Sequence, residues 1–244
     1  MAFQSTNTVV LLKPIVKLHP IFADQYQGEW VNYNLGDKVD RVFYKPKTDF
    51  YRANGRAIVF GNGLSRTRWP LVKFNQSNKS KLLPHYNILY GCNRAFQEKG
   101  EFDFLTVSSK LMATEIPKDL HQICYANQET QRVNPKMNLL PLYQRFDAGS
   151  SAVLLACFHG ANRVFLFGFD GDESNFYFDT KFYPASGTDI DTSGWSDNLY
   201  QIMISYPNVK FYQVGNTPAH SRRMTVLPNY ESLTFSEFVS YADL

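Results

Sequence analysis

The sequence has little cysteine and no long apolar run. Its three cysteines, Cys92, Cys124 and Cys157, are widely separated and lack Cys-x-x-Cys spacing, which argues against a disulfide framework and against a zinc site. No uninterrupted apolar run approaches the roughly 20 residues that a membrane span needs, and the N-terminus lacks the pattern of a secretory leader. We therefore expect a cytoplasmic protein without a membrane span.

The sequence also lacks any concentration of basic residues. Its formal net charge is +3, and no block rich in lysine and arginine marks a surface that would follow a phosphate backbone. We therefore expect no nucleic-acid partner. Internal repeats and low-complexity tracts are absent as well, which excludes a repeat architecture.

What the chain does have is enough apolar material for a full core. Of 244 residues, 44% are hydrophobic and 16% aromatic, as expected for one folded domain with an appendage. We divide it into an N-terminal arm or edge hairpin at residues 1–54 and a single nucleotide-binding domain at residues 55–244. The tyrosine-rich arm either packs on its own domain or contacts a neighbour, as a homo-oligomer or in a larger assembly.

A strand and a glycine turn begin the second segment. Residues 56–60 are apolar and partly β-branched, and Gly61, Asn62, Gly63 and Ser65 follow at once, which predicts a buried strand running into a tight turn. Glycines let a backbone approach a ligand, and a helix capped by Ser65 would present free amides to a phosphate. A structural β-turn is the alternative for so short a motif.

Three further predicted strands end in small polar residues. They cover residues 85–92, 102–107 and 122–125, and Asn93 and Ser108 follow the first two. In an open α/β sheet, ligands bind beyond the carboxyl ends of the strands, so Asn62, Asn93 and Ser108 would border one crevice. Each is also typical of a turn that stabilises its own backbone.

An almost wholly apolar helix is predicted for residues 152–160, and it should be buried against the sheet. Gly149 and Ser150 at its start are a second candidate anion contact. Arg145, just before, is suited to neutralising a phosphate, with a solvated loop arginine as the alternative. We interpret His159, near the helix end, as a capping or packing residue and not as a base.

The most hydrophobic strand, residues 163–167, ends in Gly168, Phe169 and Asp170. The Asp170 carboxylate could accept from ribose hydroxyls. With Asp172 it also has spacing that suits a divalent cation, but acidic turns containing glycine are common, and we predict no essential metal.

Taken in order, these motifs resemble the bacterial sialyltransferases of glycosyltransferase family 42. The resemblance covers about residues 56–215, and its specificity lies in the order of short motifs. They are Gly-Asn-Gly-Leu-Ser at 61–65, Cys-Asn-Arg at 92–94, Gln-Arg at 144–145 with Gly149, Gly-Ala-Asn-Arg at 160–163, Phe-Gly-Phe-Asp at 167–170 and Phe-Asp-Thr-Lys at 178–181.

The resemblance implies a Rossmann-like α/β domain, a mostly parallel sheet flanked by helices and carrying a lid segment. It implies that Asn62, Asn93 and Arg145 contact a cytidine-monophosphate sugar, which is a substrate, so that no cofactor or metal is needed. Ser108 stands where the family has a third asparagine. The two lid tyrosines fall on Gly171 and Phe176, although Tyr177 is adjacent.

The family's general-base histidine falls near Asp191, in a stretch that contains no histidine. Asp189 or Asp191 could take the proton of the acceptor, and both are explained equally by an acidic loop that caps the following helix. Two functions follow. The first is a glycosyltransferase that moves a sugar from a nucleotide to a glycan-type hydroxyl acceptor. The second is a non-catalytic relative that serves as a structural or interaction module.

Overall fold

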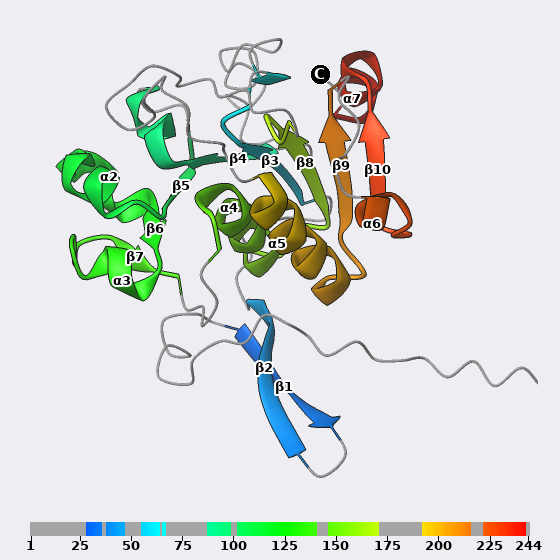
Figure 1. Cartoon of the computed structure of the whole chain (residues 1–244), viewed down its shortest axis with the longest axis horizontal. Helices are drawn as coiled ribbons and strands as arrows, with labels where there is room; N and C mark the ends of the chain where they lie inside the picture. Colours follow the sequence, from blue (N-terminus) through cyan, green and yellow to red (C-terminus); the bar gives the residue numbers. More distant parts are fainter. Residues whose placement is uncertain are drawn as a thin grey trace, which may run out of the picture.

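The computed structural model of the chain describes residues 55–63, 65–66, 87–98, 102–140, 146–170, 192–215 and 222–242, and the backbone of residues 28–35 and 38–46. It confirms the α/β class, with a Rossmann-like sheet between layers of helices (Figure 1). The sheet has eight strands in the order β10-β9-β8-β3-β4-β5-β6-β7. Every neighbouring pair in it is parallel.

The strands of this sheet are short, and the edge strand β7 has only two residues. Their bounds are β3 (Arg56–Phe60), β4 (Asn87–Cys92), β5 (Phe104–Val107), β6 (Cys124–Ala126), β7 (Asn138–Leu139), β8 (Arg163–Phe167), β9 (Lys210–Val214) and β10 (Tyr230–Leu233). A separate antiparallel hairpin, β1 (Gly28–Leu35) and β2 (Lys38–Pro46), lies within the segment predicted as an arm or hairpin.

The order of the strands reverses beside β3. From β3 the chain adds β4 to β7 on one side, and it then returns to place β8, β9 and β10 on the other. Ile58 of β3 is accordingly paired with Leu89 of β4 and with Phe165 of β8. In open α/β sheets, ligands bind at such a reversal, outside the carboxyl ends of the strands. The topology therefore directs attention to the loops after β3, β4 and β8.

Helices cover both faces of the sheet. The described α-helices are α2 (Lys110–Glu115), α3 (Gln128–Gln131), α4 (Ala148–Phe158), α5 (Thr192–Ser205), α6 (Arg222–Thr225) and α7 (Phe235–Ala242), and the 3₁₀ helices are η3 (Asn93–Gln97) and η4 (Lys118–Ile123). One face packs against α4 and α5, and the opposite face packs against η3, α2 and α7. No helix in these ranges is both long and apolar enough to cross a bilayer.

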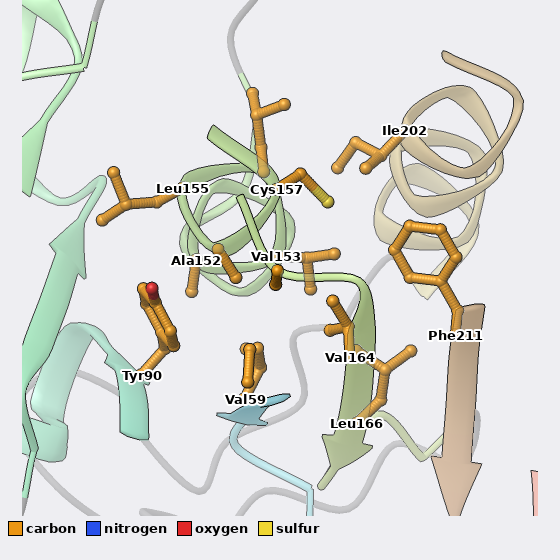
Figure 2. Close-up of a cluster of buried hydrophobic side chains, with 14 of the residues drawn as sticks. Val59, Tyr90, Ala152, Val153, Leu155, Cys157, Val164, Leu166, Ile202 and Phe211 are labelled. Atoms are coloured by element: carbon orange, nitrogen blue, oxygen red, sulfur yellow. The ribbon is translucent and has the colours of Figure 1, made fainter. Parts of the chain in front are cut away.

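The central strands are buried on both faces, which is why their sequences are continuously apolar and not alternating. All of β3 is buried, and α4 is buried except at Gly149. Figure 2 shows Ala152 and Val153 on the side of α4 that faces the strands, and Cys157 toward Ile202 of α5. On the other face, Phe238 of α7 meets the rings of Phe165 and Phe167 edge-on. The burial predicted for the apolar helix is confirmed.

Between residues 127 and 141 the sequence shows no periodic pattern, and we predicted no helix or strand there, which was wrong. This stretch contains α3 and β7, which are too short to produce a periodic pattern. The sequence analysis also missed β10, because two of its four residues, Glu231 and Ser232, are exposed and polar. β10 is the outermost strand, so its side chains need not be apolar.

His159, at the C-cap of α4, is a packing residue as predicted. It is 3% exposed, and its Nδ1 lies 2.9 Å from the hydroxyl oxygen of Tyr90. The rings of Phe104 and Tyr125 lie against it, with centroids 4.4 and 6.0 Å away. Burial lowers the pKa of His159 from 6.5 to about 3, so the imidazole is neutral at physiological pH.

The buried His159 predicts a pH-dependent stability. Protonation of His159 favours the unfolded chain, in which its pKa is higher. The contribution of the neutral imidazole to the free energy of unfolding should therefore be complete above about pH 6.5. It should fall by up to about 1.4 kcal/mol per pH unit as the pH drops toward 3. Urea unfolding between about pH 7 and pH 5 measures the slope. The double variant Tyr90→Phe/His159→Phe removes both hydrogen-bonding partners and should flatten it. Equal slopes in the two proteins would contradict this account.

Candidate functional site

The loops after β3 and β8 are joined backbone to backbone at the point where the strand order reverses. Gly61 N–H donates to Phe167 O at 2.7 Å, and Gly63 N–H donates to Gly168 O at 2.8 Å. A Cβ at Gly61 would lie 2.4 Å from Gly168 O, and Gly168 has φ +68°. The glycines, which we expected to let a ligand come close to the backbone, instead let the two loops come close to each other.

Asp170 is bound into the same junction. Its Oδ2 accepts from Ser65 N–H at 2.7 Å, and Ser65 Oγ accepts from Gly168 N–H at 3.1 Å. A Cβ at Gly63 would lie 2.5 Å from Asp170 Oδ2. The 8% exposed Asp170 therefore caps the turn at Ser65, and the amide proposed for a phosphate already has an intramolecular acceptor. The ribose contact of Asp170 stays a prediction.

The loop after β8 is held from its other side by two residues that the sequence analysis did not single out. Gln213 Nε2 on β9 donates to Phe169 O at 2.9 Å. Tyr230 on β10 donates to Gln213 Oε1 at 2.6 Å. Both side chains belong to strands with mixed polarity, and only the parallel pairing of β8, β9 and β10 brings them to this loop.

Asn62, Asn93 and Ser108 lie together, as the parallel arrangement of β3, β4 and β5 predicted. Asn62 Oδ1 accepts from Cys92 Sγ at 3.5 Å, and Asn93 Oδ1 accepts from Ser108 N–H at 3.2 Å. All three residues are partly exposed. Asn93 has φ +46°, a left-handed conformation that asparagine tolerates better than most residues. Polar side chains from three strand ends therefore border one surface.

The first turn of α4 joins this surface through β5. Thr106 Oγ1 donates to Ala148 O at 2.6 Å. The helix is capped by Asp147, whose Oδ1 accepts from Ser150 N–H at 2.8 Å and whose carbonyl accepts from Ser151 N–H at 2.9 Å. Ser150 is fully buried and its Oγ donates to Trp195 O at 3.4 Å. We predicted Gly149 and Ser150 as anion contacts, and of these two residues Gly149 is partly exposed.

Sequence reasoning missed Asp147 and Thr106, although Asp147 carries a readable signal. An aspartate three residues before a serine, at the start of an apolar run, is typical of a helix N-cap. Thr106 offers no such signal, because a threonine in a strand is ordinary and its bond to Ala148 spans 42 residues of sequence.

The basic residue beside the glycine turn is neutralised internally. Arg66 is 4% exposed, donates to Gly61 O at 3.0 Å and forms an ion pair with Glu98. Cys92 is buried as well, and burial raises the pKa of its thiol to about 12, so this group is not a nucleophile near neutral pH. Within the described residues, no three His, Cys, Asp or Glu side chains gather as a metal site would require.

The remaining predicted site residues lie outside the described residues. They are Arg145, Tyr177, Asp189 and Asp191, together with Asp172 of the alternative metal pair.

No model of a protein family matches the sequence, and the search of curated proteins also found no match. A sialyltransferase of known structure is similar. It is described as the crystal structure of the sialyltransferase CST-II in complex with trisaccharide acceptor and CMP, and the alignment covers 71% of this chain and 86% of that chain. At 15% sequence identity and a TM-score of 0.40, the similarity is distant and does not establish membership of a family.

The junction between the two loops predicts that Gly168→Ala is destabilising. The new Cβ would lie 3.0 Å from Gly61 O and from both Gly63 N and Gly63 O, at a φ that alanine rarely adopts. We expect a loss of about 2 kcal/mol or more in the free energy of unfolding, measured with urea. Gly194→Ala, an exposed glycine inside α5, is the matched control and should be neutral or stabilising. A Gly168→Ala protein as stable as this control would disprove the account.

Proposed function

We propose that the protein binds a cytidine-monophosphate-linked sugar beyond the carboxyl ends of β3, β4 and β5 and transfers the sugar to an acceptor hydroxyl. One observation carries the proposal: Asn62, Asn93 and Ser108 come from three separate strand ends, and they border one surface next to the N-terminus of α4. Amide side chains can both donate and accept, which is what recognition of a base and a phosphate requires.

The phosphate of the nucleotide is assigned to the first turn of α4. Asp147 occupies the N–H groups of Ser150 and Ser151. Gly149 is partly exposed, and its N–H is the one that we assign to the phosphate. The positive end of the helix dipole favours an anion at this position.

The proposed chemistry is a single displacement. The acceptor oxygen attacks the anomeric carbon, the bond from that carbon to the phosphate oxygen breaks, and cytidine monophosphate leaves with the electron pair. Asp191 or Asp189 takes the acceptor proton, Arg145 neutralises the phosphate and Tyr177 contacts the leaving group. These three roles come from the sequence motifs, and neither a metal nor a cofactor takes part.

Nucleotide binding is the first test. Millimolar cytidine monophosphate should raise the melting temperature of the full chain, because a ligand that binds only the native state stabilises it. Asn62→Ala should weaken binding roughly tenfold, the effect of about one lost hydrogen bond.

Asn138→Ala is the matched control, because Asn138 lies on β7 at the edge of the sheet and its side chain donates to Gln122 O. It should bind the nucleotide as the wild type does. If cytidine and uridine nucleotides leave the melting temperature of the wild type unchanged, the protein does not have the proposed function.

The second test separates binding from chemistry. Asp191→Asn or Asp189→Asn should slow the release of cytidine monophosphate from cytidine-monophosphate sialic acid about a hundredfold, the usual contribution of a general base, and should leave nucleotide affinity unchanged. The exposed Asp197, which pairs with Arg223 at 3.8 Å, supplies the control variant Asp197→Asn. Full turnover in both of the first two variants would exclude these aspartates as the base.

A further inference from the structure

The hairpin formed by β1 and β2 is too small to be stable by itself. Within the described part of the chain, its two strands pair only with each other. β2 comes close to α4, and Figure 1 shows the hairpin extending away from the eight-stranded sheet. A sheet of two strands is at best marginally stable in water, whereas three or more strands with a shared apolar face are stable. Another strand beside the hairpin would therefore stabilise it.

β2 has three features that protect the edge of a sheet from pairing with another chain. It ends at Pro46, and its register against β1 shifts so that Tyr44 has no opposite residue, as in a β-bulge. It also carries four charged residues, which are Lys38, Asp40, Arg41 and Lys45. Proline, bulges and charges, lysine above all, are the means by which edge strands avoid pairing between molecules. β2 is therefore a protected edge.

β1 has none of these features. It contains no proline, every one of its eight residues has an opposite residue on β2, and its one charged residue, Glu29, stands opposite Lys45. Because successive residues of a strand alternate between the two faces, one face of β1 is an apolar row. This row consists of Val31, Tyr33 and Leu35. β1 is therefore an unprotected edge that offers apolar surface to another strand.

From this difference between the edges, we infer that β1 pairs antiparallel with β1 of a second copy of the chain, about a twofold axis, so that the two hairpins form one four-stranded sheet. Twofold pairing sets residues of the same face opposite each other, so the apolar rows of the two copies join. Glu29 lies near the end of β1, so the two Glu29 residues are not opposite each other when most of the strand is paired. Pairing through β2 would instead bring three basic residues of each copy together.

Sedimentation equilibrium of the full chain at micromolar concentration tests the pairing. The wild type should have twice the mass of one chain. Asn32→Glu keeps the hairpin intact, because position 32 is opposite Arg41. It sets two like charges beside each other across the twofold axis, and it should raise the dissociation constant of the dimer about fivefold.

Val39→Glu is the matched control for the introduced charge. Val39 lies on β2, opposite Asn34, so the same charge then stands in the next row of the same face but at the protected edge. This variant should dissociate as the wild type does.

Disulfide trapping identifies the paired strand. The native cysteines Cys92, Cys124 and Cys157 are buried, so a cysteine introduced on the hairpin reacts in their place. About a twofold axis, one residue of β1 stands opposite its own copy. One of the variants Val31→Cys, Asn32→Cys and Tyr33→Cys should therefore oxidise to a covalent dimer much faster than the other two.

Val42→Cys is the control for trapping, because Val42 is opposite Val31 but lies on β2. In the four-stranded sheet two strands separate the copies of this residue, which is too far for a disulfide, and the variant should give no covalent dimer.

The inference is overturned by a wild type that sediments as a monomer. It is also overturned by a dimer that Asn32→Glu leaves unchanged and that no cysteine on β1 traps, because the two copies then meet at another surface. Trapping through Val42→Cys in place of the β1 variants would show that the other edge of the hairpin is the paired one.

Discussion

The backbone junction between the loops after β3 and β8 is the constraint on which the rest of the site depends. Two hydrogen bonds, from Gly61 to Phe167 O and from Gly63 to Gly168 O, hold together the two strands at which the strand order reverses. At such a reversal an open α/β sheet usually has a crevice in which a ligand binds. Here the two loops are in contact, and the glycines are required because no Cβ fits between them.

This junction moves the candidate binding surface to one side of the reversal. The space between the loops after β3 and β8 is occupied by Asp170 and Ser65. The partly exposed polar side chains of Asn62, Asn93 and Ser108 lie instead on the β4 and β5 side. A glycine motif that suggests phosphate binding can thus serve mainly to bring two loops together, and the ligand contacts then depend on its neighbours.

At this end of the sheet, carboxylates cap two helical turns, the one at Ser65 and the first turn of α4. Asp170 accepts from the amide of Ser65, and Asp147 accepts from that of Ser150. In each case a group that could have bound an anion bonds within the protein, and the helix end gains a fixed position instead. Fewer amides therefore remain for a ligand, and the proposed phosphate contact is limited to the partly exposed Gly149.

The sequence alone determined the α/β class, the central strands and the buried helix α4. Continuous apolar runs bounded by glycine and small polar residues are typical of strands in a parallel sheet, which helices bury on both faces. Parallel pairing also made it predictable that Asn62, Asn93 and Ser108 would lie at the same end. The hydrogen-bond partners were not predictable. Thr106 with Ala148, Asp170 with Ser65 and Gln213 with Phe169 each join residues far apart in the sequence. Whether a side chain bonds a ligand or a distant backbone group depends on distances that only the folded chain sets.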